Sequence, residues 1–251
     1  MPCSAGRCST LGTGTAVSEG TDGPVRIDRF GDIFTRAMDR KGLSLSAKHY
    51  VCTNPTFETG IAGHAAATAT DDSKPFLTLQ NTVGVTSMLR IQPLRLVLVC
   101  TAAGTNGTDL RYTIHKSAAG VSRFTSGGSS AGNGGASTLS VFPTSVSGAT
   151  TSALIRAGAV VAPTDANKVR VAGGTLRTVI NVVQDMYIFD FGSENPGSTP
   201  AYAGATATAT IVHRSIAPLT LEAQETMTFS LIAASQSAAP SYELYLEYCE
   251  I

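Results

Sequence analysis

The most regular feature of the chain is an alternation of apolar and polar side chains near its C-terminus. The alternation runs from residue 226 to 233 and returns from residue 242 to 248. A period of two is typical of a strand with one buried face. We therefore interpret residues 211–251 as three strands joined by short turns, which must pair with strands far upstream to satisfy their backbone groups. The apolar positions are Met227, Phe229, Leu231, Ala233, Tyr242, Leu244, Leu246 and Tyr248.

Short apolar runs separated by Gly, Asn, Asp or Pro predict further strands along most of the chain. The run at 94–99 is almost wholly apolar and predicts a central strand covered on both faces. Asn106-Gly107 is a strong hairpin signal and predicts that residues 109–116 fold back on that strand. The Gly- and Ser-rich segments 126–137 and 192–200 are predicted to be exposed loops. The predicted strands are 43–52, 60–70, 75–82, 87–101, 109–116, 121–125, 152–161, 168–171, 175–183, 187–191 and 205–214.

Many short strands at regular spacing predict an all-β fold, a β-sandwich or jelly roll, extending from residue 43 to 251. Residues 1–24 are rich in Gly, Ser and Thr and poor in large apolar side chains, which predicts a flexible, extended N-terminal arm. Residues 25–42 form a linker segment with a short strand at 25–30. Residues 32–41 fit either a short helix that begins at Asp32 or a hairpin.

The composition disfavours two classes of partner. The 251-residue chain has 18 basic and 18 acidic residues, and charged residues make up 14% of it. We therefore expect no nucleic-acid partner. No apolar run approaches the roughly 18 residues that span a bilayer, and no apolar leader is present, so we expect no membrane anchor and no export by a cleaved signal. The five cysteines are irregularly spaced, which favours free thiols in a reducing compartment.

Few residues suggest catalysis or metal binding. Residues 128–132 match the G-x-S-x-G pattern of serine hydrolases, but Ser130 is predicted to lie in a loop with no helix after it, so we interpret the match as chance. The four histidines are scattered singly. We predict that the chain is not an enzyme and needs no cofactor. The carboxylates of the 185–190 segment are interpreted as solvated turn residues rather than calcium ligands.

One set of soft ligands leaves an alternative open. Cys3 and Cys8 form one pair, and His49 and Cys52 form another, which is the outline of a structural zinc site. The spacing fits loosely, and one pair lies in the predicted arm. Thiols and a histidine without metal are the simpler interpretation.

The charges are unevenly distributed along the chain. Residues 26–48 contain six basic and three acidic residues, whereas five glutamates and no Lys or Arg follow Arg214. These segments are either two solvated faces or surfaces that meet across subunits or dock on a larger assembly. For the second case the predicted partner contacts are Arg26, Arg29, Arg36 and Arg40.

Several runs carry a resemblance to a known group of proteins. They are residues 50–56, 60–64, 76–81, 101–107, 123–128, 187–192 and 240–244. Together they resemble tailed-bacteriophage virion proteins of β-sandwich type. The resemblance implies a structural particle protein, a capsid decoration or cement subunit whose partners are the major capsid protein or other virion subunits. The alternative is a tail or fibre component, or a glycan- or receptor-binding sandwich module.

The resemblance also implies where the chain works: in the virion, after assembly in the host cytoplasm. We expect residues 1–24 to become ordered only in a groove of a neighbouring subunit, where their backbone groups extend a sheet edge. Acidic C-terminal strands that meet the basic segment of a neighbouring copy would close a ring, which predicts self-association as a homotrimer.

Overall fold

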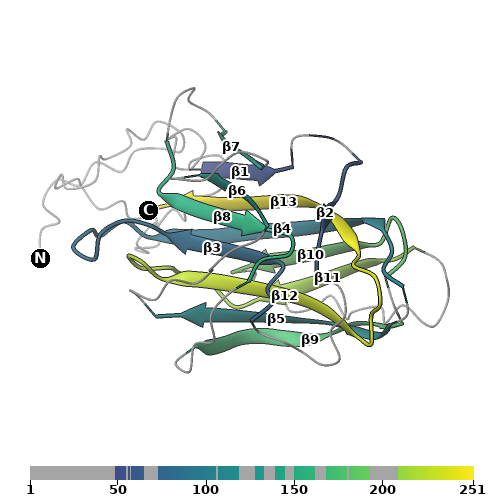
Figure 1. The fold of residues 1–251 in the computed structure, drawn as a ribbon. Helices are drawn as coiled ribbons and strands as arrows, with labels where there is room; N and C mark the ends of the chain where they lie inside the picture. Colours follow the sequence, from purple (N-terminus) through teal and green to yellow (C-terminus); the bar gives the residue numbers. More distant parts are fainter. Residues whose placement is uncertain are drawn as a thin grey trace, which may run out of the picture. The chain divides into compact units, whose positions relative to one another are not determined.

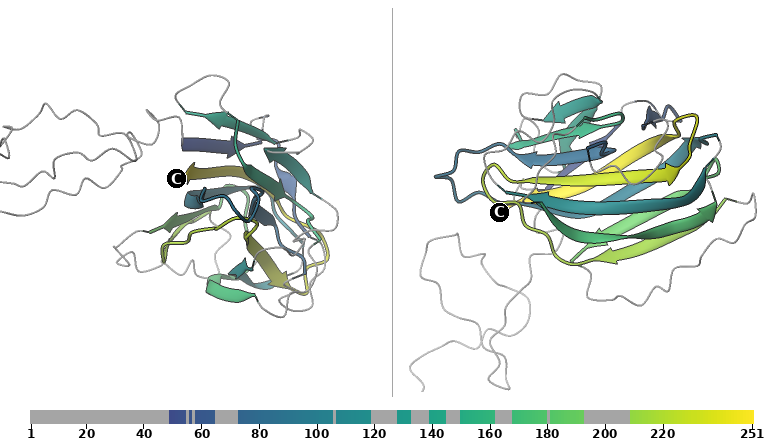
Figure 2. Two further views of the ribbon diagram at one scale, coloured as in Figure 1. Left: turned by 90° about the vertical axis from the view of Figure 1, so that its left-hand side faces the viewer. Right: turned by 60° about the horizontal axis from the view of Figure 1, so that its bottom comes forward.

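The computed structural model describes residues 49–54, 56, 58–64, 73–105, 107–118, 128–132, 139–144, 150–161, 168–179, 181–192 and 209–251. In these residues thirteen strands form two sheets that pack face to face, and no helix occurs among them (Figures 1 and 2). The predicted β-sandwich is therefore confirmed. The predicted arm, the 25–42 segment and the strand at 121–125 lie outside the described residues.

The first sheet has the strand order β11-β10-β4-β13-β1-β7, and β2 pairs with one end of β13. All of its described pairs are antiparallel except β10 with β11, which run parallel. Its strands are β1 (His49–Thr53), β2 (Ile61–Ala62), β4 (Ile91–Ala102), β7 (Ser140–Pro143), β10 (Met186–Phe191), β11 (Ile211–Ile216) and β13 (Ser241–Glu250).

The second sheet has the order β6-β8-β3-β12-β5-β9 and is antiparallel throughout. β9 lies at one edge and pairs with β5 along most of its length. Its strands are β3 (Leu77–Asn81), β5 (Thr108–Ser117), β6 (Ser129–Gly132), β8 (Ala153–Ala157), β9 (Val169–Val179) and β12 (Thr226–Ala234).

Eight of these strands have jelly-roll connectivity. In the first sheet they are β10-β4-β13-β1, and in the second they are β3-β12-β5-β9. The chain crosses repeatedly between the sheets, and its last two strands, β12 and β13, each lie between two earlier strands. This is the double Greek-key arrangement of jelly rolls, so the predicted pairing of the C-terminal strands with distant upstream strands is confirmed.

The core lies between the sheets and is rich in aromatic side chains. Phe189 of the first sheet packs edge to face on Phe229 of the second, with ring centroids 4.9 Å apart. Tyr112 lies 5.0 Å from Phe189, and Phe76 lies 5.3 Å from Tyr242. Such contacts add about 0.5–1.5 kcal/mol each to the burial of apolar area. They hold the two sheets in one register across the core.

Several local predictions are wrong. β5 does not fold back on β4: the two strands belong to different sheets, and Thr105 pairs with Ala238 of the β12–β13 connection. The 126–137 segment contains a strand, β6, in which Ala131 is buried. The segments 168–171 and 175–183 belong largely to one continuous strand, β9. In β12 the residues opposite the apolar face, Thr226, Thr228 and Ser230, are buried as well.

A fully buried ion pair joins the sheets at one end of the sandwich. Arg177 of β9 and Asp185, which precedes β10, both have side chains that are 0% exposed. The Asp185 carboxylate accepts hydrogen bonds from Arg177 Nη1, the Tyr187 hydroxyl, Val182 N and Thr210 N. These donors come from both sheets and from two connections. The carboxylate is therefore compensated well enough to remain buried.

Removing one member of this pair should cost much of the stability. We expect Arg177→Met to lower the free energy of unfolding by about 3–5 kcal/mol, because it leaves the Asp185 carboxylate buried without a counter-charge. Arg90→Met is the matched control. It breaks an exposed pair with Glu222, whose side chains are 53% and 50% exposed, and should cost less than about 1 kcal/mol. Urea unfolding of both variants tests this, and similar losses would contradict it.

Candidate functional site

A row of charged side chains crosses the outer face of the first sheet. Each member comes from a different strand and faces outward. Outward-facing positions of neighbouring strands lie side by side, so the five residues form a row across the sheet. In spatial order the row contains His213 of β11, Asp190 of β10, Arg95 of β4, Glu247 of β13 and His49 of β1. Acidic and basic members alternate along it.

The distances show direct contacts within two parts of this row. Arg95 Nε donates to Asp190 Oδ1 at 2.6 Å, and His213 Nε2 lies 2.5 Å from Asp190 Oδ2. His49 Nε2 lies 2.8 Å from Glu247 Oε1, and its Nδ1 lies 2.9 Å from the Thr144 hydroxyl. The contacts fall into two groups: His213, Asp190 and Arg95 connect β11, β10 and β4, and Glu247 and His49 connect β13 and β1.

The electrostatics of Asp190 follow from these neighbours. Burial on its own would raise the pKa of the Asp190 carboxyl, but hydrogen bonds from Arg95 and His213 outweigh burial and hold that pKa below its ordinary value. The same hydrogen bond raises the pKa of Arg95. The predicted solvated turn carboxylates are therefore wrong: Asp190 lies in a strand and is 9% exposed, and Asp185 is fully buried.

The described cysteines do not form the predicted zinc outline with His49. Residues 49 and 52 point to opposite faces of β1: His49 lies on the outer face beside Glu247, whereas Cys52 belongs to the core. Burial raises the pKa of the Cys52 thiol to about 12 and the pKa values of Cys100 and Cys249 to about 11, which opposes the thiolate that zinc requires. Cys3 and Cys8 lie outside the described residues.

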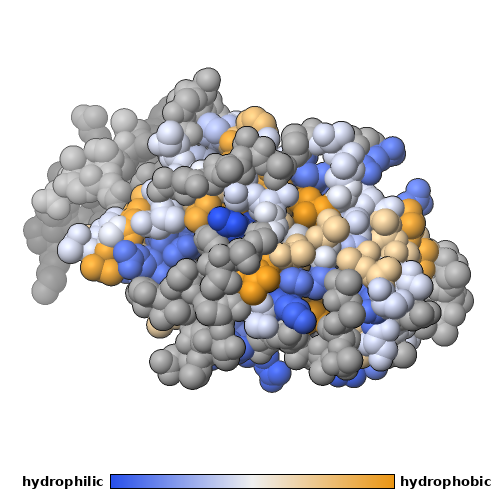
Figure 3. Space-filling view, in the orientation of Figure 1, coloured by the Kyte–Doolittle hydropathy of each residue, from blue (hydrophilic) through white to orange (hydrophobic). Residues whose placement is uncertain are grey.

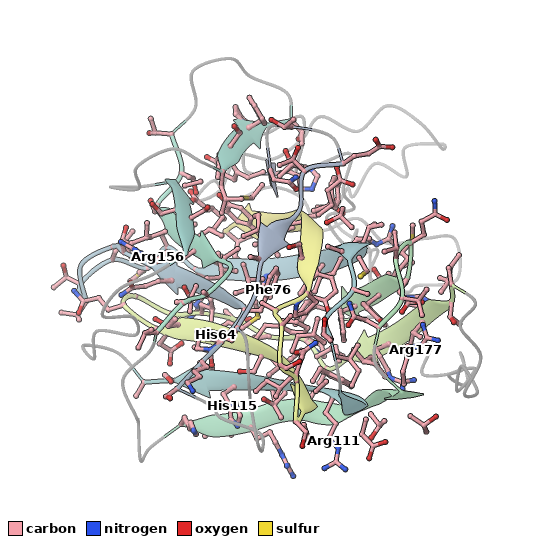
Figure 4. The ribbon with its side chains drawn as sticks, turned by 45° about the vertical axis from the view of Figure 1, so that its right-hand side comes forward. His64, Phe76, Arg111, His115, Arg156 and Arg177 are labelled. Atoms are coloured by element: carbon pink, nitrogen blue, oxygen red, sulfur yellow. The ribbon has the colours of Figure 1, made fainter. Side chains whose placement is uncertain are left out.

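Other candidate groups have structural positions. Ser130 lies within β6, opposite Arg156 of β8, and not at a turn between a strand and a helix. His64 Nε2 lies 2.5 Å from the Val160 carbonyl oxygen, and Figure 4 shows His64 apart from His115, which belongs to β5. Among the described residues no group of three or more His, Cys, Asp or Glu side chains is placed to hold a metal ion.

The five C-terminal glutamates all have partners within the chain. Their partners are Arg90 for Glu222, Lys116 for Glu225, Glu58 N for Glu243, His49 for Glu247, and Thr151 with Ser152 N for Glu250. Because these carboxylates bond to groups of the same chain, less acidic surface is available to a partner. The predicted partner contacts Arg26, Arg29, Arg36 and Arg40 lie outside the described residues and remain predictions.

One loop presents apolar side chains to solvent. The β3–β4 loop, residues 82–90, projects past the strands it connects (Figures 1 and 2). Val85 is 69% exposed and Met88 is 91% exposed. Figure 3 shows hydrophobic residues at the left-hand end of the molecule, where this loop lies in Figure 1.

The loop is held in place by a buried amide. Asn81 is 0% exposed, and its Nδ2 donates to the carbonyl oxygens of Leu89 and Leu221 at 3.0 and 3.1 Å. Its Oδ1 accepts from Val83 N, and Ser87 N donates to Gly84 O within the turn. Both ends of the loop are thus fixed to the sandwich, and the exposed Val85 and Met88 side chains are presented from an ordered backbone.

Comparison with protein-family models, with curated proteins and with solved structures found no match for this chain. No helix in the described part of the chain is long and apolar enough to cross a membrane. The function must therefore be argued from the residues described above.

The charged row leads to a pH-dependent prediction. Because the folded-state pKa of Asp190 is lowered, its ionised carboxylate stabilises the fold at neutral pH. That contribution is lost as the pH falls below about 4, through the folded-state pKa. The Asp190→Asn variant has no carboxylate at this position and so lacks this contribution to stability. The difference in unfolding free energy between wild type and variant should therefore be largest above about pH 5 and shrink toward pH 3.

Urea unfolding over this pH range measures the difference. Asp109→Asn is the control, because Asp109 forms an exposed pair with Arg111, with side chains 42% and 56% exposed. Its effect should be small at every pH. A difference for Asp190→Asn that stayed constant down to pH 2 would contradict the assignment.

Proposed function

We propose that the chain is a non-enzymatic structural subunit of a bacteriophage virion, and specifically a capsid decoration protein that docks on the head through its β3–β4 loop. The resemblance to virion proteins supports the first part, as does the jelly-roll connectivity, an architecture used by viral capsid and lectin domains. Because a fold alone does not define a function, the proposal depends on the loop.

The exposure of the loop tip is the observation that carries the proposal. A single exposed apolar residue is ordinary on a protein surface. Here Val85 and Met88 are both largely exposed and stand on one short loop. Burying each of them in a partner would contribute about 1.5–3 kcal/mol, and the unbranched Met side chain adapts to the shape of the surface it meets.

The order of the loop strengthens the argument. A mobile loop would lose conformational entropy on docking, at about 0.5–1.5 kcal/mol for each side chain that is immobilised. The bonds of Asn81 and the Ser87–Gly84 turn fix the backbone in advance. Arg90 and Glu222 form an exposed ion pair at the base of the loop. An apolar tip with a polar surround is the usual composition of a small interface.

The partner that fits this tip is an apolar depression on a neighbouring capsid subunit. The predicted homotrimer and the predicted contacts through Arg26, Arg29, Arg36 and Arg40 belong to the same proposal, as additional anchoring beside the loop. A tail or fibre location, or a glycan-binding role, is the second candidate. A concavity over β5 and β9 of the second sheet favours it.

Substitution at the loop tip tests the docking. In virions assembled with Met88→Asp, the number of copies of the chain per particle, measured by quantitative mass spectrometry, should fall at least about tenfold, because a charge would be buried against an apolar surface. The fold should be unchanged, since Met88 is 91% exposed. Val183→Asp, at another exposed apolar position (46%), is the matched control and should leave the copy number unchanged.

The outcomes separate the parts of the proposal. Absence of the wild-type chain from purified virions would overturn the virion assignment. Presence of the chain with equal copy numbers for wild type and Met88→Asp would overturn docking through the loop.

A further inference from the structure

The outer face of the second sheet carries a concavity over β5 and β9. Its volume is about 540 Å³, and its lining includes Arg111, Thr113, Arg170, Gly173 and Thr175. This volume lies within the range of small-molecule sites, roughly 300–1,000 Å³. Figure 4 shows Arg111 and His115 along β5, and Arg156 at the opposite end of the same sheet.

Two irregularities in β9 shape the concavity. Thr113 pairs with Gly173, Arg111 with Thr175 and His115 with Arg170. The register shifts once between Leu110 and Arg111, and again between Ile114 and His115, so β9 carries an extra residue on each side of the paired Gly173. Such bulges bend and twist a strand. The strand therefore bends at both ends of the hollow.

Gly173 keeps the middle of the hollow empty. Its partner Thr113 faces outward, because Tyr112 and Ile114 on either side are core residues, so a side chain at 173 would also project outward. A Cβ at this position would lie 3.2 Å from Tyr112 O, 3.4 Å from Thr113 Cγ2 and 3.7 Å from Arg170 Cδ, which places the glycine against β5 and beside the Arg170 stem. The absence of a side chain at 173 leaves room between Arg111 and Arg170.

The polar groups that line the hollow favour an anion. Arg170 is exposed and has no ion-pair partner among the described residues, and Arg111 is paired only with the exposed Asp109 there. Among the described residues that line the hollow there is no carboxylate. A guanidinium presents a fork of donors that matches a carboxylate or a phosphate.

From these observations we propose that the hollow binds an anionic sugar, whose carboxylate or phosphate pairs with Arg170 and Arg111 and whose hydroxyls meet Thr175. A single protein carboxylate would fill little of a 540 Å³ hollow, whereas one or two sugar rings with their hydroxyls suit its size and polarity. The hollow is lined by residues of β5 and β9 and by none of the β3–β4 loop, so the inference is independent of capsid docking.

Binding is tested on the full chain by isothermal titration calorimetry. The probes are glucuronate, which carries a carboxylate, glucose 6-phosphate, which carries a phosphate, neutral glucose, and inorganic phosphate. We expect at least one of the two anionic sugars to bind, and neutral glucose to bind at least about tenfold more weakly, because it lacks the charge. The affinity should fall with added salt, since the hollow is open to solvent.

Three variants locate the site. Arg170→Ala should weaken binding at least about tenfold, because it removes the arginine that has no described ion-pair partner. Gly173→Val should weaken it through a side chain that enters the hollow. Arg90→Ala, at an exposed arginine outside the hollow, should leave it unchanged.

Each contrary result overturns the inference. It is wrong if neither anionic sugar binds, if neutral glucose binds equally well, or if inorganic phosphate alone binds as tightly as the sugar acids. It is also wrong if Arg170→Ala and Arg90→Ala behave alike.

Discussion

The structure depends on one buried charge pair, Arg177 with Asp185. An unpaired charge in this position would be costly, so the surrounding backbone has to supply the remaining partners of the carboxylate. Val182 N and Thr210 N donate hydrogen bonds to the Asp185 carboxylate. These bonds bring the segments that precede β10 and β11 together beside the edge strand β9. The pair therefore joins the two sheets at one end of the sandwich.

The same pair is connected to the surface of the second sheet. Leu176 and Arg177 are adjacent, yet both are fully buried, because the bulge between Thr175 and Arg177 interrupts the usual alternation of faces. That bulge also bounds the hollow lined by Arg111 and Arg170. The irregularity that carries a charge into the core thus shapes the proposed anion site on the outside. In the β3–β4 loop, too, a buried polar group fixes a surface feature. The buried amide of Asn81 holds the backbone that carries the exposed Val85 and Met88 side chains.

Much of the fold could be predicted from local patterns, and the failures have physical causes. The alternation around Phe229 and Leu244 predicted strands correctly, because one face of each has to enter the core. The hairpin expected at Asn106-Gly107 failed because turn propensity is local, whereas the sheet that a strand joins is decided by long-range pairing. The sequence pattern predicts two strands in place of β9 because Gly173 and Gly174 separate the apolar runs, whereas in the structure both glycines lie inside one bent strand.

The site residues were harder to predict. Arg95, Asp190 and His213 come from separate strands, and only the sheet register brings them together. The same is true of Arg111 and Arg170. The adjacent glycines Gly173 and Gly174 were the one sequence signal for the hollow over β5 and β9, since a glycine inside a strand often marks a bulge or a close approach. The exposure of Met88 had no signal in the sequence, because an apolar residue in a loop is equally compatible with burial.

The most direct test of the central claim, that this jelly roll is a head decoration protein docked through its β3–β4 loop, is an electron cryomicroscopy reconstruction of virions that contain the chain. The account predicts density for the sandwich on the outer surface of the head, with residues 82–90 against an apolar surface of a neighbouring capsid subunit and the hollow over β5 and β9 facing solvent. Density at the tail tip, or on the head with the loop pointing into solvent, would contradict it.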